Sequence, residues 1–346
     1  MKEIKVSSLV IGDCLSKDVY NDLGNIILAQ GTEITNKHIE YFQKHGIEFV
    51  YLNEFEAESP ILKNYEFRTF SEHYSQLINS YKNLYFKVKE NNFDFDANTL
   101  KNDLRPMLMH VFKENDILSF LRNTEVEEEY YLTHSVNVSI LSAITAKWLN
   151  LDGESIEIVA LAGLLHDIGK ARVDHNIMYK VDKLSAYEMS KMREHSKLGY
   201  EIVKENPTIP RDILSTILFH HERCDGAGYP SGLTEEQTPY FARIVAVADV
   251  FDAITSNKVY RAKVSSFKAF SIIKDESFKG LDPEICEIFL NNIANFFVNN
   301  KVILNDGRIG DVVYINKYAL NRPLIRVNDD FIDLSMDYSL DIDEVL

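Results

Sequence analysis

The chain has 346 residues, of which 45% are hydrophobic and 26% charged, enough for a full hydrophobic core and for more than one domain. Its formal net charge of -16 argues against a nonspecific binder of DNA, RNA or anionic membranes, because these would repel it at long range. No stretch approaches the roughly 18 consecutive apolar residues that span a bilayer, and the first residues lack the apolar core of a signal peptide. A cytoplasmic protein is therefore expected, and three widely spaced cysteines without a CxxC pair fit a reducing compartment.

The first 55 residues predict a small α+β module. Short apolar runs alternate with turn residues there, a short helix is expected near residues 35–45, and residues 47–52 favour a strand. Residues 56–125 predict a helical connector, because Tyr74, Leu77, Ile78 and Tyr81 recur at helical spacing. The polar run NNFDFDAN divides this connector.

Residues 126–299 predict an all-α domain, interrupted by the glycine-rich loop of residues 226–233. Residues 300–346 alternate in β fashion around turn signals at residues 306–307 and 328–330. The expected fold is therefore mainly α: a helical core with a small N-terminal α+β module and a short C-terminal β appendage.

Metal-competent side chains recur at helical intervals through the central segment. Six of the ten histidines lie in it, most of them on otherwise apolar helices, and burying so many imidazoles without partners would be unfavourable. Neutral imidazoles and carboxylates suit first-row divalent cations, and one carboxylate can bridge two of them. We therefore interpret seven residues as the ligands of a two-metal hydrolase site: His134, His166, Asp167, His195, His220, His221 and Asp249.

The run VALAGLLHDIGK carries the dipeptide of His166 and Asp167 at the end of an apolar helix. Gly169 then lets the chain turn, so that Lys170 can point back toward the pair. The remaining histidines are interpreted as structural or surface residues: His38, His45, His73, His110 and His175.

The loop GAGYPSGL follows two candidate ligand histidines and should lie at the rim of the metal pocket. Gly226 and Gly228 permit positive φ and close backbone approach, and Pro230 stiffens the following turn. Tyr229 could present its ring edge or hydroxyl to a substrate. We expect substrate contacts from Gly228, Tyr229 and Pro230.

Four charged residues near the ligands leave alternatives open. Asp252 lies three residues after Asp249 on the same helix face, where it could orient the substrate or a ligand. Glu222, Arg223 and Asp225 could support ligand imidazoles or be solvated charges.

Three runs resemble the HD-GYP family: HDIGK at residues 166–170, HHERCDGAGYP at residues 220–230 and RIVAVADVFDAITS at residues 243–256. The resemblance covers about residues 126–295. It implies an HD-type helical bundle and a binuclear iron or manganese centre. It also implies hydrolysis of cyclic di-GMP to linear pGpG or GMP by a hydroxide that bridges the metals.

Carried over to this chain, the family pattern implies two ligand groups that share Asp167. One metal would be held by His134, His166, Asp167 and Asp249, and the second by Asp167, His195, His220 and His221. Asp167 and Lys170 would then be the catalytic residues, since the Lys170 ammonium offsets charge that grows on the phosphate oxygens in the transition state.

Two positions depart from the family pattern. The glutamate that trinuclear members carry four residues before His134 is Tyr130 here, so two metals are expected. The usual arginine after Asp252 is Lys258, with Arg261 nearby, and both are expected substrate contacts.

Three functions remain open. The favoured one is a cyclic di-GMP phosphodiesterase, and the second is a phosphodiesterase for another nucleotide, such as mixed cyclic GMP-AMP. The third is a cyclic-dinucleotide receptor or scaffold. The absence of metal-ligand residues from the family pattern would have favoured this third function, and none of them is absent. The N-terminal module could regulate activity or mediate a homodimer.

Overall fold

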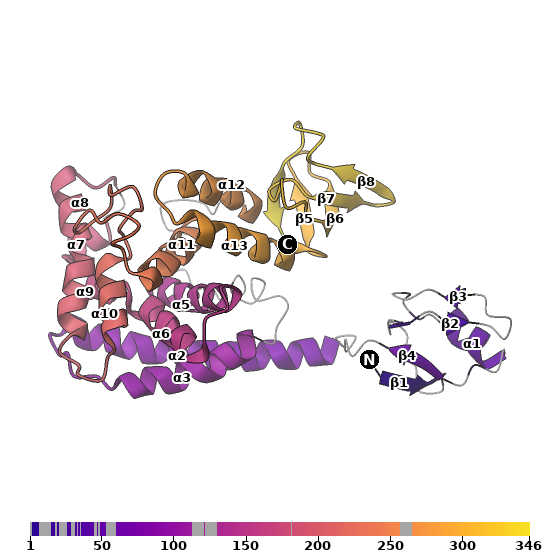
Figure 1. Ribbon diagram of the computed structural model, residues 1–346, viewed down its shortest axis with the longest axis horizontal. Coiled ribbons are helices and arrows are strands. Elements are labelled where there is room, and N and C mark those ends of the chain that lie inside the picture. The colour runs from indigo at the N-terminus through magenta and orange to yellow at the C-terminus, as the bar shows by residue number, and fades with distance from the viewer. Residues whose placement is uncertain are drawn as a thin grey trace. The chain divides into compact units, whose positions relative to one another are not determined.

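The structure is a computed structural model (Figure 1), and it divides into two compact units, Met1–Thr69 and Phe70–Leu346. The predicted boundaries at residues 55, 125 and 299 stay predictions. The structure describes residues 2–6, 15–17, 19–20, 26–28, 32, 34, 36–44, 47, 49–52, 60–112, 121, 130–180, 182–256 and 265–346.

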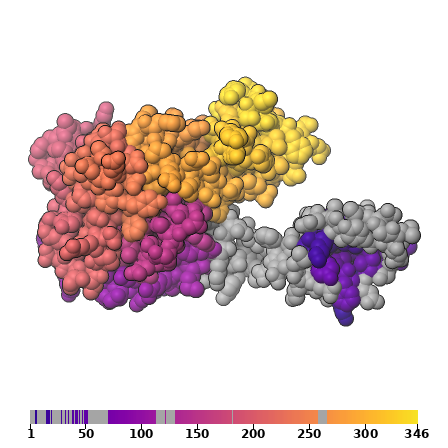
Figure 2. All heavy atoms as spheres, viewed as in Figure 1, coloured from indigo at the N-terminus to yellow at the C-terminus, as the bar shows by residue number. Residues whose placement is uncertain are grey.

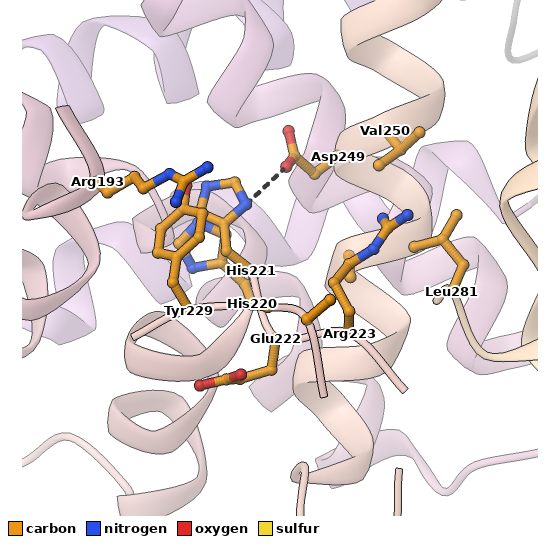
Figure 3. A pocket seen from close by; sticks show the side chains of 12 residues that line it. Arg193, His220, His221, Glu222, Arg223, Tyr229, Asp249, Val250 and Leu281 are labelled. Atoms are coloured by element: carbon orange, nitrogen blue, oxygen red, sulfur yellow. Dashed lines mark ion pairs between the residues drawn. The ribbon is translucent and has the colours of Figure 1, made fainter. Parts of the chain in front are cut away.

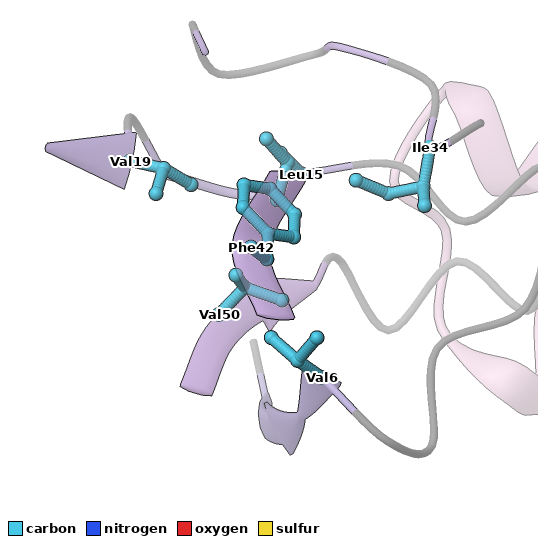
Figure 4. Packing of buried hydrophobic residues seen from close by; sticks show 6 residues of the cluster. All are labelled: Val6, Leu15, Val19, Ile34, Phe42 and Val50. Atoms are coloured by element: carbon cyan, nitrogen blue, oxygen red, sulfur yellow. The ribbon is translucent and has the colours of Figure 1, made fainter. Parts of the chain in front are cut away.

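The first unit is the expected small α+β module. Strand β1 (Lys2–Lys5) pairs antiparallel with β4 (Phe49–Leu52), and β2 (Val19–Tyr20) pairs antiparallel with β3 (Ile26–Leu28). Helix α1 (Asn36–Lys44) contributes Phe42 to the core, and its Ile39 packs against that core. Figure 4 shows this core, which consists of Val6, Leu15, Val19, Ile34, Phe42 and Val50.

A helical hairpin follows. Helix α2 (Pro60–Lys89) and helix α3 (Ala97–Val111) lie side by side (Figure 1), with Gln76 Nε2 and Ser80 Oγ donating to the Asp103 carboxylate. The predicted stripe is buried at Tyr74, Leu77 and Tyr81, whereas Ile78 is only partly buried.

The break between these two helices lies where the polar run predicts it. Asn91 has a positive φ of 63° just after α2, and Asp96 caps α3 by accepting from the Asn98 backbone N–H. Two helices therefore lie within the residues of the predicted connector, at residues 60–89 and 97–111.

The helical domain is built on a closely packed pair, α5 (Tyr130–Trp148) and α6 (Gly153–Leu165). A Cβ added to Gly163 would lie 3.0 Å from the Ser139 Cα, and Ser139 Oγ donates to the Ala160 carbonyl at 2.6 Å. Small residues thus let the two backbones approach closely. The elements that follow are η3 (Ile168–Arg172), α7 (His175–Met178), α8 (Ala186–Arg193), α9 (His195–Val203), α10 (Arg211–Phe219), α11 (Tyr240–Thr255), α12 (Ser266–Ser277), α13 (Pro283–Ile293) and η4 (Ala294–Phe297).

The C-terminal residues form one antiparallel sheet of five strands in the order β8-β7-β6-β5-β9. Gly307, with φ of 85°, and Asn328, with φ of 55°, lie between paired strands, where the turn signals predict them. Ser265 Oγ donates to the Ile342 carbonyl, and in Figure 2 the yellow sheet lies against the orange end of the helical domain. The strands are β5 (Lys301–Leu304), β6 (Ile309–Tyr314), β7 (Leu324–Val327), β8 (Asp330–Asp333) and β9 (Ile342–Val345).

The mainly α fold with N-terminal α+β and C-terminal β parts is thereby confirmed. Among the helices of the described residues, none combines the length and the apolar character that crossing a bilayer requires.

Candidate metal centre

Helix ends orient three of the candidate ligands. His166 follows α6, His195 opens α9 and His220 follows α10. In each ring, Nδ1 lies 2.7–2.8 Å from the backbone carbonyl three residues earlier in the chain. These carbonyls fix the ring orientation and hold the proton on Nδ1, which leaves Nε2 as the nitrogen that can bind a metal.

Asp167 lies at the centre of the cluster. Its Oδ2 is 3.4 Å from His166 Nε2 and 3.6 Å from His134 Nε2, and its Oδ1 is 3.3 Å from His195 Nε2. Ligand atoms within 4.8 Å of one another form two groups, and Asp167 belongs to both. The groups are His134, His166 and Asp167, and Asp167, His195, His220 and His221.

Asp249, from helix α11, lies between the two groups. Its Oδ1 is 3.1 Å from His134 Nε2 and 3.9 Å from His166 Nε2, and its Oδ2 is 4.0 Å from His221 Nδ1 (Figure 3). The fold thus brings together all seven side chains that the sequence pattern singles out.

Two buried atoms of this cluster indicate that the residues fit a cation. His166 Nε2 and Asp167 Oδ1 have no hydrogen-bond partner among the described residues. An unpaired buried polar atom costs about 1–3 kcal/mol, so such atoms are rare unless something else binds them. Both are lone-pair donors aimed into a set of imidazole and carboxylate ligands, which suits a divalent metal ion.

Electrostatics keep most of these ligands able to coordinate. Burial lowers the pKa of His195 to about 4 and that of His221 to about 3, and it holds the pKa of His220 well below 6.5. Burial by itself would raise the pKa of Asp167, but Lys170 and His166 hold it well below its usual value. At neutral pH these imidazoles are neutral and this carboxylate is ionised.

His134 differs from the other histidines. Burial opposes its charged form, but hydrogen bonds to Asp249 and Asp252 raise the pKa of His134 to about 9. Its Nε2 lies 3.1 Å from an Asp249 carboxylate oxygen, and its Nδ1 lies 2.6 Å from an Asp252 carboxylate oxygen.

Lys170 does point back toward the dipeptide, because its ammonium forms an ion pair with Asp167 Oδ2. The role expected for Gly169 was a turn, and the structure gives a different reason for the glycine. A Cβ there would lie 2.0 Å from the His195 carbonyl oxygen and 2.5 Å from the Gly199 nitrogen. Gly169 is therefore needed for the close approach of η3 to α9, which brings Asp167 next to His195.

The glycine-rich loop lies over the second ligand group. The Tyr229 ring stacks on His221 with centroids 4.6 Å apart, and the Arg193 guanidinium lies 5.0 Å from the Tyr229 centroid (Figure 3). Gly226 has a positive φ of 77°. Gly228 is not among the positive-φ glycines of the described residues. A Cβ at Gly228 would lie 2.4 Å from the backbone nitrogen of Arg223, so glycine is needed here because the two backbone segments approach each other closely.

Glu222 anchors this loop. Its carboxylate is only 4% exposed and accepts from the backbone N–H groups of Ser231 at 2.6 Å and Leu233 at 2.9 Å. Glu222 thus holds the loop backbone, and it neither supports a ligand imidazole nor is a solvated charge, the two alternatives that the sequence left open. Arg223 pairs with Glu276, and Asp225 accepts from the Ala227 N–H at 3.0 Å.

A pocket of about 260 Å³ opens beside the second ligand group (Figure 3). Gly228, Tyr229 and Arg223 line it, and so does Arg193, a positive charge that the sequence pattern did not single out. Arg193 lies two residues before His195, which is the one signal that could have drawn attention to it. Pro230 follows Tyr229 through a cis peptide bond.

The remaining expected substrate contacts are placed differently. Asp252 is buried, is not among the described residues that line the pocket, and contacts His134 Nδ1 at 2.6 Å. Of its two alternatives, the geometry favours orienting a ligand over contacting substrate. Lys258 and Arg261 lie outside the described residues.

Residues 115–285 match the family model of the HD domain. Cyclic di-GMP phosphodiesterase PA4108 of Pseudomonas aeruginosa is 35% identical over 214 residues, which are 62% of this chain and 51% of that protein. Cyclic di-GMP phosphodiesterase PdeB of Borreliella burgdorferi is 26% identical over 336 residues, 94% of this chain and 85% of that protein. This chain thus spans about half the length of PA4108 and most of PdeB.

A third relative is named for a different cyclic dinucleotide. The 3'3'-cGAMP-specific phosphodiesterase 3 of Vibrio cholerae is 30% identical over 169 residues, 49% of this chain and 36% of that protein. Among solved structures, Bd1817 of Bdellovibrio bacteriovorus, described as an HDG"Y"P protein, covers 84% of this chain and 98% of its own. With a TM-score of 0.53 and 18% identity, it shows a shared fold. From the HD-domain match and the relatives, residues 115–285 belong to the HD-domain family, and the runs HDIGK and GYP are similar to those of its HD-GYP members.

Proposed function

We propose that the protein is a metal-dependent phosphodiesterase that hydrolyses cyclic di-GMP to linear pGpG, GMP or both. The observation that carries the proposal is the convergence of six imidazole and carboxylate side chains around Asp167, beside a pocket lined by Arg193 and Arg223. The names of PA4108 and PdeB support the same substrate.

The ligand arrangement supports two divalent ions, which we propose to be iron or manganese. His134, His166, Asp167 and Asp249 would hold one, and Asp167, His195, His220 and His221 the other. When bound, such ions supply the Lewis acidity that activates water and offsets charge on a phosphodiester. Tyr130 occupies the position of a third-metal carboxylate, and its ring stacks on His134 with centroids 5.4 Å apart.

The side chains of this chain would bind and orient the substrate. Lys170 is close enough to Asp167 to offset negative charge at the reacting phosphate. The Arg193 guanidinium would attract the dianionic substrate into a chain whose net charge is -16, whereas the Arg223 charge is offset by its ion pair with Glu276. Tyr229, held against His221 by stacking, would form one wall.

The test is turnover of cyclic di-GMP under anaerobic conditions by protein loaded with iron or manganese, with metal content measured on the same sample. Hydrolysis with about two metals per chain supports the proposal. Metal-loaded protein that binds cyclic di-GMP without hydrolysing it would be a receptor, and the catalytic proposal would then be wrong.

Mixed cyclic GMP-AMP is the second candidate substrate, because the Vibrio cholerae relative is named for it. The metal ligands would contact the phosphodiester, which both dinucleotides share, and not the bases. Running both substrates side by side at equal concentration decides between them, since the preferred substrate has the higher kcat/KM.

A cytoplasmic location and a homodimer also stay predictions. Fractionation of the producing cells and the mass in solution of the purified full chain would test them.

A further inference from the structure

A buried line of hydrogen bonds connects helix α2 with the metal centre. The Tyr74 hydroxyl lies 2.7 Å from Asn137 Oδ1, and Asn137 Nδ2 lies 2.9 Å from Asp252 Oδ1. Asp252 Oδ2 in turn lies 2.6 Å from His134 Nδ1, and His134 Nε2 faces Asp249 and Asp167. Two side chains, Asn137 and Asp252, thus link a tyrosine of α2 to a candidate metal ligand.

The direction of each hydrogen bond in this line is determined by its chemistry. An ionised Asp252 can only accept, so Asn137 must turn its amide NH₂ toward it and its amide oxygen toward Tyr74. Tyr74 must therefore donate to Asn137. For the same reason His134 must donate its Nδ1 proton to Asp252, so Nε2 is the ring nitrogen that can release its proton and bind a metal.

This line of hydrogen bonds depends on two pairs of residues, and the members of each pair are three positions apart in the sequence. His134 and Asn137 lie on the same face of α5, and Asp249 and Asp252 lie on the same face of α11. His134 contacts both aspartates, and Asn137 contacts the second one. Packing of α5 against α11 thereby places a ligand pair and a supporting pair side by side.

Burial leaves little room for water to replace a missing partner. The exposed fractions are 2% for Tyr74, 2% for Asn137, 3% for Asp252 and 4% for His134. Ser256 Oγ also donates to Asp252 Oδ1 at 3.1 Å. The Tyr130 hydroxyl lies 3.5 Å from His134 Nδ1, farther than the Asp252 carboxylate.

We propose that Tyr74 and Asn137 are positioning residues of the metal centre: through Asp252 they set the orientation and tautomer of His134, and so its affinity for a divalent cation. This inference rests on the metal-binding part of the proposed function and is independent of the substrate. It also gives helix α2 a part in the site, although the seven candidate ligands all lie beyond residue 130.

The chain offers a matched pair of variants. Tyr74→Phe and Tyr81→Phe each remove one hydroxyl from a buried tyrosine of the same helix. The Tyr81 hydroxyl accepts from Ser135 Oγ at 3.1 Å, and no hydrogen bond among those of the described residues connects Ser135 with a candidate ligand. Asp252→Asn serves as the third variant, because it alters the group that touches His134.

The readout is the dissociation constant for Mn²⁺, measured on the full chain without substrate, together with urea unfolding of the chelator-treated protein. We expect Asp252→Asn to weaken Mn²⁺ binding by about 10- to 100-fold. Tyr74→Phe should weaken it by about 2- to 10-fold, the effect of one hydrogen bond of ordinary net strength. Tyr81→Phe should leave the dissociation constant unchanged while lowering stability to a similar extent.

Unchanged Mn²⁺ binding in Tyr74→Phe, or equal weakening in both tyrosine variants, would overturn the inference, because the hydroxyl would then act only on stability. A wild-type chain that binds no Mn²⁺ would overturn both this inference and the metal centre. If the Mn²⁺ dissociation constants of the variants change as expected but the protein hydrolyses no cyclic dinucleotide, the proposed function is overturned and this inference stands.

Discussion

At the scale of single residues, Asp167 is the residue on which both candidate metal positions depend. It is the one member shared by the two candidate ligand groups, and Lys170 and His166 hold its pKa well below the usual value despite burial. A carboxylate that contacts both groups can serve two cations at once, which no single imidazole can do.

Asp167→Ala should therefore remove bound metal and abolish turnover. We expect the loss to exceed the about 10- to 100-fold that removal of an outer partner of a ligand causes. His175→Ala is the matched control, since His175 is exposed and belongs to neither ligand group. Equal loss of metal and turnover in the two variants would show that the ligands are misassigned.

The Lys170→Ala variant distinguishes an effect on metal binding from an effect on catalysis. The ammonium touches Asp167 without being a ligand, so metal content should persist while kcat falls by about 100-fold or more. Metal analysis and steady-state kinetics on the same preparation give both numbers. A variant that loses its metal would mean that Lys170 acts by supporting Asp167.

At the scale of elements, the approach of η3 to α9 decides whether Asp167 and His195 can meet. The backbone of Gly169 lies so close to α9 that a side chain would overlap the His195 carbonyl. Periodicity predicts both neighbouring helices, but it carries no information on how closely their backbones pass.

Gly169→Ala should destabilise the fold by about 1–3 kcal/mol or more, because the backbone must move to admit the methyl group. It should also weaken metal binding, since His195 would be displaced. Gly153→Ala is the control: its Cβ would meet nothing within 4 Å at the start of α6, so stability should stay equal or rise by about 0.4–1 kcal/mol. Urea unfolding of both variants measures the difference, and similar values for the two would contradict this account.

At the scale of the whole molecule, the buried imidazoles connect stability with pH. Burial lowers the pKa of His195 to about 4 and that of His221 to about 3, from 6.5 in the unfolded chain. Between about pH 4 and 6.5 the unfolded state therefore binds more protons, so stability rises with pH across this window. The pKa of His134 is raised to about 9, so its contribution is complete below pH 6.5 and is lost as pH rises through 9.

Chelator-treated protein should accordingly be most resistant to urea near neutral pH, with a lower midpoint at pH 4.5 and at pH 9.5. Added Mn²⁺ should raise the midpoint at pH 7 and raise it less toward pH 4.5, because the metal must displace a proton from His134, whose pKa is raised to about 9. Urea titrations across this range check both statements. A midpoint at pH 4.5 equal to that at pH 7 would contradict the assigned burial of the imidazoles.

Much of the fold and site could be predicted because the relevant signals are local. The stripe of Tyr74, Leu77 and Tyr81 predicts a helix with one buried face, and the turn signals at Gly307 and Asn328 predict the hairpins. The ligand inventory was predictable too, since histidines on apolar helices need partners wherever those helices pack.

The sequence by itself determined which side chains can bind a metal, which segments are helical and where the glycine-rich loop falls. Only the tertiary structure decided that Asp252 supports His134 and that Arg193 lies over Tyr229. It likewise decided that Tyr74 reaches the site through Asn137. The physical reason is sequence distance: His134 and Asp252 are 118 residues apart, and Tyr74 and Asn137 are 63 apart. Such contacts depend on how whole helices pack, and local periodicity does not specify that packing.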